Sequence, residues 1–170
     1  PNGIGSTECL DTAGNRRVEY FRTASGVVKR LIRRTFGELS RLTELRNSAN
    51  QLVTKYPILG GYDPNGNATL SVDGLGVKTH QEYDPLNRLK TTIQDYLGSE
   101  PETANASMGY QYDTRNNLRQ VTDPDGLNTV YDYDGLNNLT GLHSPDTGDT
   151  TYTYDPAGNR VTQTDARNVT

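Results

Sequence analysis

Residues 122–141 read TDPDGLNTVYDYDGLNNLTG, and this stretch decides the fold because it holds two turn signals with one strand between them. Aspartate, glycine and asparagine gather at both ends, and these residues form tight turns. Tyr131 and Tyr133 lie between the turns, and a spacing of two places both rings on one face of a β-strand. The stretch therefore predicts a strand that links two hairpin turns.

The second half of this stretch recurs along the chain as a phrase that begins with Tyr-Asp. The five copies begin at Tyr62, Tyr83, Tyr112, Tyr133 and Tyr154. The steps between them are 21, 29, 21 and 21 residues, so one step is the common period plus an insertion of eight. A fixed period indicates a chain built from one copied structural unit.

Each phrase places turn-forming residues directly after Tyr-Asp. The Asp can accept backbone N–H groups in an Asx turn, and the proline that follows it in three copies fixes its own φ. Gly66 and Gly158 supply a positive φ, and we expect Asn87, Asn117 and Asn138 to do so in the other copies. Second turn signals follow about 11 residues past the tyrosines, at Asp73, Asp123, Ser144 and Asp165. Each unit is thus predicted to contain two short strands and two turns.

The N-terminal part carries fainter copies of the phrase, LDTAGNRRV from Leu10 and FGELSRLTE from Phe36. We expect one continuous repeat domain, with degenerate repeats in residues 1–60, regular repeats in 61–170 and an insertion near 99–107. Residues 27–45 allow two interpretations. Their apolar residues lie near helical spacing, whereas the phrase at Phe36 keeps the repeat register and favours strands.

Composition is compatible with a folded domain of this kind. The chain has 170 residues, 11 tyrosines and a hydrophobic fraction of 32%, and regular alternation of this kind is absent from disordered tracts. No apolar stretch approaches the roughly 20 residues that span a bilayer, so no membrane span is predicted. The chain begins at Pro1 and ends within a repeat, so we expect a longer parent protein.

No group of residues predicts a catalytic, cofactor-binding or metal site. Cys9 is the single cysteine, and His80 and His143 lie in inter-turn strands without a regular set of partners. A metal site needs three or four converging ligands. The aspartates recur in equivalent turns, which a repeat explains without catalysis or specific calcium binding, and we predict that the chain is not an enzyme.

Charge is unevenly distributed. Residues 1–46 contain nine Lys or Arg and five Asp or Glu, a net charge of +4, and residues 47–170 carry −8. The basic residues Lys29, Arg30, Arg33, Arg34, Arg41 and Arg46 could contact nucleic acid. A solvated strand face, or pairing with the acidic part of the protein, is the favoured explanation, and no nucleic-acid partner is predicted.

The phrases YDPLNRLK, YDPAGNRVTQTDARNVT and TDPDGLNTVYDYDGLNNLTG resemble the YD-repeat, or RHS-repeat, family of bacterial proteins. The resemblance covers residues 60–170 well and 10–60 loosely. It implies an all-β fold of consecutive antiparallel β-hairpins in a curved, spiral sheet. In that family the sheet forms a hollow shell that encloses or presents a C-terminal toxin domain for export.

The resemblance also implies the partners and the location. These are the remainder of a parent RHS protein, its toxin domain and proteins of a secretion apparatus, in a protein that is secreted or displayed on the bacterial surface. The string Asp123-Pro124-Asp125-Gly126-Leu127 is similar to the DPxGL motif near which toxin members cleave themselves. Two more repeats follow it here, so an inter-strand turn is the expected structure.

A second function remains open at this stage. Strands lined with tyrosine could stack on sugars, which would make the chain a carbohydrate-binding or cell-surface-binding module. Unpaired edge strands could also associate with a second copy or with a partner chain.

Overall fold

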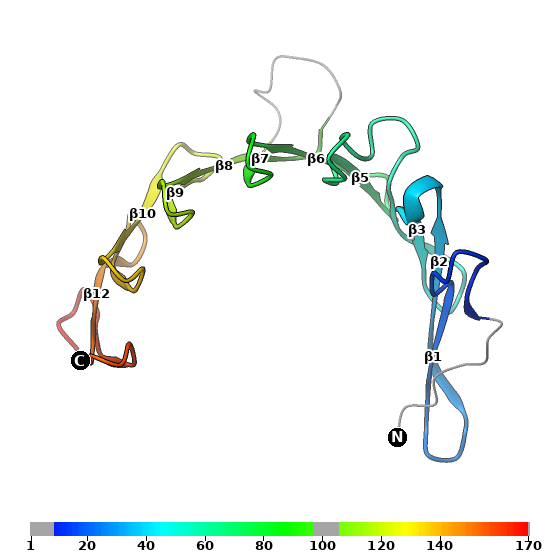
Figure 1. The fold of residues 1–170 in the computed structure, drawn as a ribbon, viewed down its shortest axis with the longest axis horizontal. Coiled ribbons are helices and arrows are strands. Elements are labelled where there is room, and N and C mark those ends of the chain that lie inside the picture. The colour runs from blue at the N-terminus through cyan, green and yellow to red at the C-terminus, as the bar shows by residue number, and fades with distance from the viewer. Residues whose placement is uncertain (1–8, 97–105, 170) are drawn as a thin grey trace. The chain divides into compact units, whose positions relative to one another are not determined.

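The computed structural model describes residues 9–96 and 106–169, and nearly all of the regular structure in them is β-strand (Figure 1). The strands are β1 (Val18–Arg22), β2 (Val28–Phe36), β3 (Leu42–Arg46), β4 (Leu52–Lys55), β5 (Leu70–Asp73), β6 (Lys78–Tyr83), β7 (Leu89–Gln94), β8 (Ala106–Tyr112), β9 (Leu118–Thr122), β10 (Asn128–Tyr133), β11 (Leu139–Ser144), β12 (Gly148–Tyr154) and β13 (Arg160–Thr164). A 3₁₀ turn, η2 (Glu38–Ser40), separates β2 from β3.

The strands follow one another in chain order in one open 13-stranded sheet. The described pairings between neighbours are antiparallel, so each strand forms a hairpin with the next. The predicted all-β fold of consecutive hairpins is confirmed. For residues 27–45, the strand interpretation is correct and the helical one is wrong, because β2, η2 and β3 occupy this segment.

The hairpin turns follow one pattern that begins at an Asp. In the turn at Asp134, the N–H of Asp134 donates to the carbonyl of Asn138 at 3.0 Å, and the N–H of Asn137 donates back to the carbonyl of Asp134 at 3.2 Å. Asn137, the third residue of the loop, has φ 66°. This is a three-residue hairpin loop, in which a left-handed residue completes the turn.

The position of the left-handed residue corrects one prediction. Positive φ values occur at Asn116 and Asn137, and not at Asn117 and Asn138 as expected, whereas the prediction for Asn87 is correct. The three-residue loop explains the shift. Its third residue must be left-handed, and the residue after it pairs with the Asp in the ladder.

Alternation gives the strands after residue 106 two different faces. Because paired residues on antiparallel strands project to the same side, the register groups one set of side chains on one face and a second set on the other. Tyr110, Val121, Thr129, Tyr131, Leu142 and Thr150 share one face. Gln111, Gln120, Val130, Asp132, His143 and Asp149 share the other.

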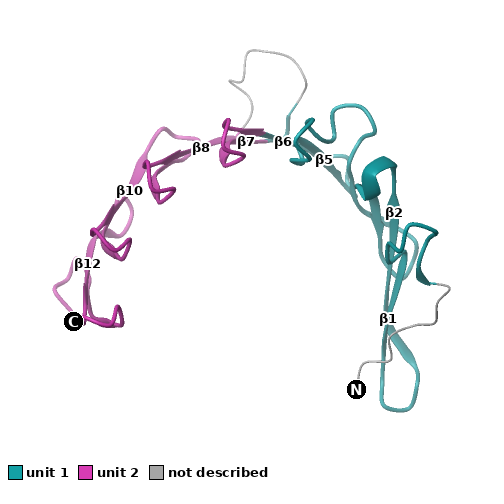
Figure 2. Ribbon diagram, viewed as in Figure 1, with its two compact units in different colours: residues 1–81, 94–100 teal, residues 82–93, 101–170 magenta. Residues whose placement is uncertain are grey.

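The described chain forms two compact units, which Figure 2 shows in different colours. The first comprises residues 1–81 and 94–100, and the second comprises 82–93 and 101–170. In the described ranges no α-helix or second sheet packs on the strands of either unit. Buried side chains are therefore few, namely Cys9, Ile93 and Thr150 among the described residues.

Two sequence predictions remain outside these observations. The division into residues 1–60 and 61–170 stays a prediction. The expected insertion near 99–107 falls mostly on 99–105, which lie outside the described residues, while residues 106 and 107 belong to β8. No described helix is long and apolar enough to cross a membrane.

Candidate functional site

The repeated Tyr-Asp turn is the most regular arrangement of polar atoms in the chain. In the turn at Asp155, Oδ1 accepts the N–H groups of Ala157 and Asn159, each at 2.9 Å. Oδ2 accepts the side-chain amide of Asn159, also at 2.9 Å. Asp63, Asp113 and Asp134 make the same contacts with the asparagine four residues later. At Asp84, Arg88 takes the place of that asparagine.

These hydrogen bonds favour the charged carboxylate. The side-chain amide of Asn159 and then its backbone N–H hold the pKa of Asp155 below its usual range. Asn138 lowers the pKa of Asp134 in the same way. An aspartate used in this manner supports the turn and is not poised to transfer a proton at neutral pH.

The tyrosine of the pair connects the turn to earlier strands. The hydroxyl of Tyr62 donates to the carbonyl of Leu42 at 2.8 Å, and the hydroxyl of Tyr154 donates to the carbonyl of Leu139 at 2.8 Å. The guanidinium of Arg88 lies 4.7 Å from the ring centre of Tyr112. Desolvation raises the pKa values of Tyr62 and Tyr112.

Successive Tyr-Asp turns also bind one another, and they form what we call the turn ladder. Arg88 donates through Nη1 to Oδ1 of Asn116 at 2.9 Å, and Asn117 donates through Nδ2 to Oδ1 of Asn137 at 2.9 Å. Arg115 donates to the carbonyl of Gly135 at 3.0 Å. The partners are 20 to 28 residues apart, so the ladder joins one repeat to the next.

The turn at Phe36 departs from this pattern and lines a groove. Gly37 occupies the position of the Asp, so this turn lacks the carboxylate acceptor of the others. Leu39 and Ser40 take positive φ values of 56° and 57°. The groove measures about 500 Å³. Its lining residues are Thr35, Phe36, Gly37, Glu38, Leu39, Arg41, Thr43, Pro57, Ile58 and Tyr62.

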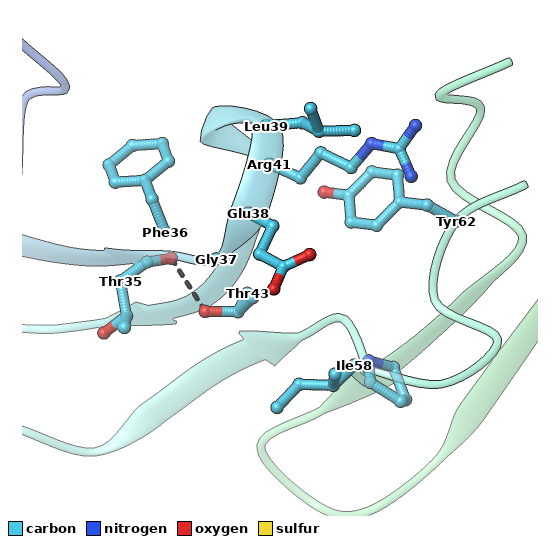
Figure 3. Close-up of a pocket in the computed structure, with 10 residues that line it drawn as sticks. Thr35, Phe36, Gly37, Glu38, Leu39, Arg41, Thr43, Ile58 and Tyr62 are labelled. Atoms are coloured by element: carbon cyan, nitrogen blue, oxygen red, sulfur yellow. Dashed lines mark hydrogen bonds between the residues drawn. The ribbon is translucent and has the colours of Figure 1, made fainter. Parts of the chain in front are cut away.

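Figure 3 shows the side chains of this groove. Arg41 lies beside the ring of Tyr62, with its guanidinium carbon 5.5 Å from the ring centre. Thr43 donates a hydrogen bond to the carbonyl of Thr35 at 3.0 Å. Leu39 and Ile58 are largely exposed. The groove is apolar and open, and it holds no cluster of groups suited to acid–base or nucleophilic chemistry.

Comparison with protein families assigns the repeated phrase. The model of the RHS repeat matches residues 62–99 and 112–149, which contain four of the five Tyr-Asp pairs. The chain carries RHS repeats. No curated protein sequence matches it significantly.

Two toxin structures contain chains that share this fold. The Tc holotoxin pore of Photorhabdus luminescens, solved as a TccC3 variant, matches with a TM-score of 0.62 and 17% identity over 89% of this chain. The TcdB2-TccC3 complex matches with a TM-score of 0.56 and 15% identity over 88%. At these identities the likeness shows the fold. The chain spans only 9% and 8% of the lengths of those chains.

Several basic residues of the segment 29–46, in the first compact unit, make contacts within the sheet. Arg34 pairs with Glu19 at 2.8 Å, and Arg46 pairs with Glu44 at 3.0 Å. Arg33 donates to the carbonyl of Asn47 at 3.2 Å. Both glutamates lie in the basic segment 1–46 itself, so these two ion pairs are not the expected pairing with the acidic part of the protein. The absence of a nucleic-acid partner stays a prediction.

The structure brings His143 together with partners that sequence reasoning missed. Its Nε2 lies 2.9 Å from Asp132 Oδ2, and its Nδ1 lies 3.0 Å from Asp149 Oδ1. These two carboxylates contact one histidine and are not the regular ligand set that a metal site needs, so that expectation stays a prediction. The partners stand on the two neighbouring strands, at positions that only the strand register brings together.

The other residues considered in the sequence have simpler surroundings. Cys9 is a buried free thiol, and His80 stacks on Tyr96 with ring centres 4.7 Å apart. Asp123 accepts the N–H groups of Asp125 and Leu127, as expected for an inter-strand turn. In the part of the chain that the structure describes, no three Cys, His, Asp or Glu residues form a metal-binding group.

Proposed function

We propose that these RHS repeats are a non-catalytic segment of a protein shell, and that the shell encloses or presents a C-terminal toxin domain for export. The observation that carries the proposal is the RHS repeat itself, built as a single layer of hairpins whose successive turns bind one another. A layer of this kind can be lengthened one repeat at a time. It can therefore enclose a volume instead of filling it with a core.

The low burial of the described residues supports this role. A compact enzyme of similar size buries a core of large apolar side chains, whereas here Ile93 is the single large one that is fully buried among the described residues. The aspartates of the repeated pairs are committed to backbone N–H groups. The repeats thus use their polar atoms for architecture.

The partners and location follow from the same proposal. The partners would be the remaining repeats of a parent RHS protein, its toxin domain and proteins of a secretion apparatus, and the protein would leave the bacterial cell. Edge strands that lack a neighbour would pair with adjoining repeats or with a second copy.

Limited proteolysis of the full-length parent protein tests enclosure. We expect the C-terminal domain to resist protease in the intact parent and to be digested quickly when it is expressed alone. Equal digestion rates in the two forms would overturn the proposal. A parent protein with this segment deleted is the matched comparison, and it should lose the protection.

Carbohydrate binding is the alternative function, and the surroundings of two tyrosines weigh against it. The hydroxyls of Tyr62 and Tyr154 donate to backbone carbonyls, so their single O–H donors serve the sheet and are not available to a sugar. Saturable binding of the chain to defined glycans on an array would favour the alternative, and a flat binding profile would exclude the glycans tested.

A further inference from the structure

His143 occupies an uncommon position between two carboxylates. Nε2 contacts Asp132 at 2.9 Å and Nδ1 contacts Asp149 at 3.0 Å, both within hydrogen-bond distance. A neutral imidazole has one N–H and one bare nitrogen, so it can donate to only one of two carboxylates. Both contacts are satisfied together only when the ring is protonated, because then each nitrogen donates.

The three residues stand on three neighbouring strands. Asp132 belongs to β10, His143 to β11 and Asp149 to β12. Asp149 pairs directly with His143, and Asp132 pairs with Gly141, two residues before the histidine on the same face. The protonated ring therefore connects the β11–β12 hairpin to the preceding strand through side chains, in addition to the backbone ladder.

The surroundings of the ring define its charge balance. From β9, Arg119 pairs with Asp132 at 3.0 Å. The remaining side chains that face the ring from β10 and β12, those of Val130 and Thr151, carry no charge. The cluster thus contains two anions, one permanent cation and one cation that titrates, and its net charge is zero only when His143 is protonated.

Gly141 gives the cluster its space. A Cβ atom at this position would lie 3.2 Å from Nε2 of His143 and 3.3 Å from Oδ2 of Asp132, so it would crowd both atoms of their hydrogen bond. The glycine has no positive φ to explain its presence. Its role in the strand is to leave room for the ion pair.

We propose that His143 is a pH-dependent clamp, which in its protonated form fastens β12 and β11 to β10 and which releases them when the ring loses its proton. The clamp is a property of the second unit by itself, and it does not depend on the proposed shell function. In mildly acidic solution the three strands are held more firmly than in alkaline solution.

The direction of the pH dependence follows from the two kinds of group. The carboxylates of Asp149 and Asp132 raise the pKa of His143 above its ordinary value of 6.5. Protonated His143 therefore stabilises the fold fully below pH 6.5, and this stabilisation is lost as the pH rises through the raised pKa. His143 and then Arg119 lower the pKa of Asp132 below 3.8. The stabilisation that ionised Asp132 provides is present above pH 3.8 and is lost as the pH falls through the lowered pKa.

NMR titration of the 170-residue chain provides the first test. We expect the His143 ring signals to titrate with a midpoint above 6.5, and both ring nitrogens to show bound protons at pH 6. A titration midpoint of His143 at or below pH 6.5 would overturn the proposal. The H80Q variant assigns the signals of the two histidines.

Hydrogen exchange provides the second test and reads the strands themselves. After correction for the intrinsic rate, the amides of Leu142 and Thr150 should be about two- to fivefold better protected at pH 6 than at pH 8.5, the range expected for partly exposed ion pairs. High salt should reduce this difference. Equal protection at the two pH values would contradict the clamp.

Two variants with the same change of charge separate the clamp from general electrostatics. D149N removes a carboxylate that contacts the ring, and it should lower the His143 midpoint and diminish the pH response of the amides. D146N removes a carboxylate from the adjoining turn, which the described contacts do not connect to the ring, and it should leave both largely unchanged. Equal effects of the two variants would contradict a specific clamp.

Discussion

At the scale of single residues, the Asp of each Tyr-Asp pair organises its turn. Its two oxygens accept two backbone N–H groups and, in four of the repeats, the amide of the asparagine four positions later. An Asx turn satisfies N–H groups that a tight loop would otherwise leave to water. The role of the Asp is therefore structural, because its oxygens serve as hydrogen-bond acceptors for the turn.

The variants D134A and D134N test this role. D134A removes every side-chain acceptor of the turn, so we expect its melting temperature to fall by about 2–4 °C. D134N keeps a carbonyl oxygen that can accept the N–H groups of Leu136 and Asn138, so its melting temperature should fall less than that of D134A. Thermal unfolding followed by circular dichroism measures both.

The control for this prediction is D125A. Asp125 lies in the comparable turn after Asp123, but it enters that turn through its backbone N–H. Its side chain can be removed with little effect. A melting temperature of D134A equal to that of D125A would show that the Asx contacts do not stabilise the turn.

At the scale of elements, close backbone contacts decide where glycine is required. In the loop between β4 and β5, the N–H of Gly61 donates to the carbonyl of Pro57 at 3.0 Å, and its own carbonyl accepts the N–H of Thr69 at 3.0 Å. A Cβ at Gly61 would lie only 2.2 Å from the Pro57 oxygen. The residue before Tyr62 must therefore be glycine for the loop to close.

We expect G61A to destabilise the fold by about 1–3 kcal/mol, the range for a forced steric overlap. G135A is the matched control, because a Cβ there meets nothing within 4 Å and Gly135 has no positive φ. Urea unfolding compares the two variants. If G61A unfolds at the same urea concentration as G135A, the tight loop is not formed in solution.

At the scale of the whole molecule, stability comes from contacts between neighbours in the sequence. Each strand from β2 to β12 pairs with the strands before and after it, and no second layer covers the described strands. Fold stability should then be a sum of repeat and neighbour contributions. A protein with one central core would instead unfold throughout when one part is removed.

Truncation of the chain after Thr147 tests this additivity, since it removes β12 and β13. We expect amides of β9, such as that of Val121, to keep their hydrogen-exchange protection within about threefold. Protection of Leu142 should drop strongly, because β11 loses its pairing with β12. Loss of protection throughout the remaining strands would refute the additive picture.

The sequence by itself determined the hairpin repeat, because turn chemistry is local. Asp, Gly and Asn specify a tight loop within five residues, and the alternation of side chains specifies the strands. The same locality indicated the all-β class, whereas residues 27–45 allowed a strand or a helix from the sequence, and only the structure decided for strands. In the pair Asn116–Asn117, the sequence prediction placed the positive φ at Asn117, one residue too late, because the three-residue loop puts it at Asn116.

Only the tertiary structure decided which side chains meet across strands. Asp132, His143 and Asp149 lie 11 and 6 residues apart in the sequence, and their contacts depend on the register of two hairpins. A shift of one residue would send the side chains to opposite faces. The charge cluster at His143 arises from this register, and the turn ladder likewise joins residues 20 to 28 positions apart that spacing alone does not bring together.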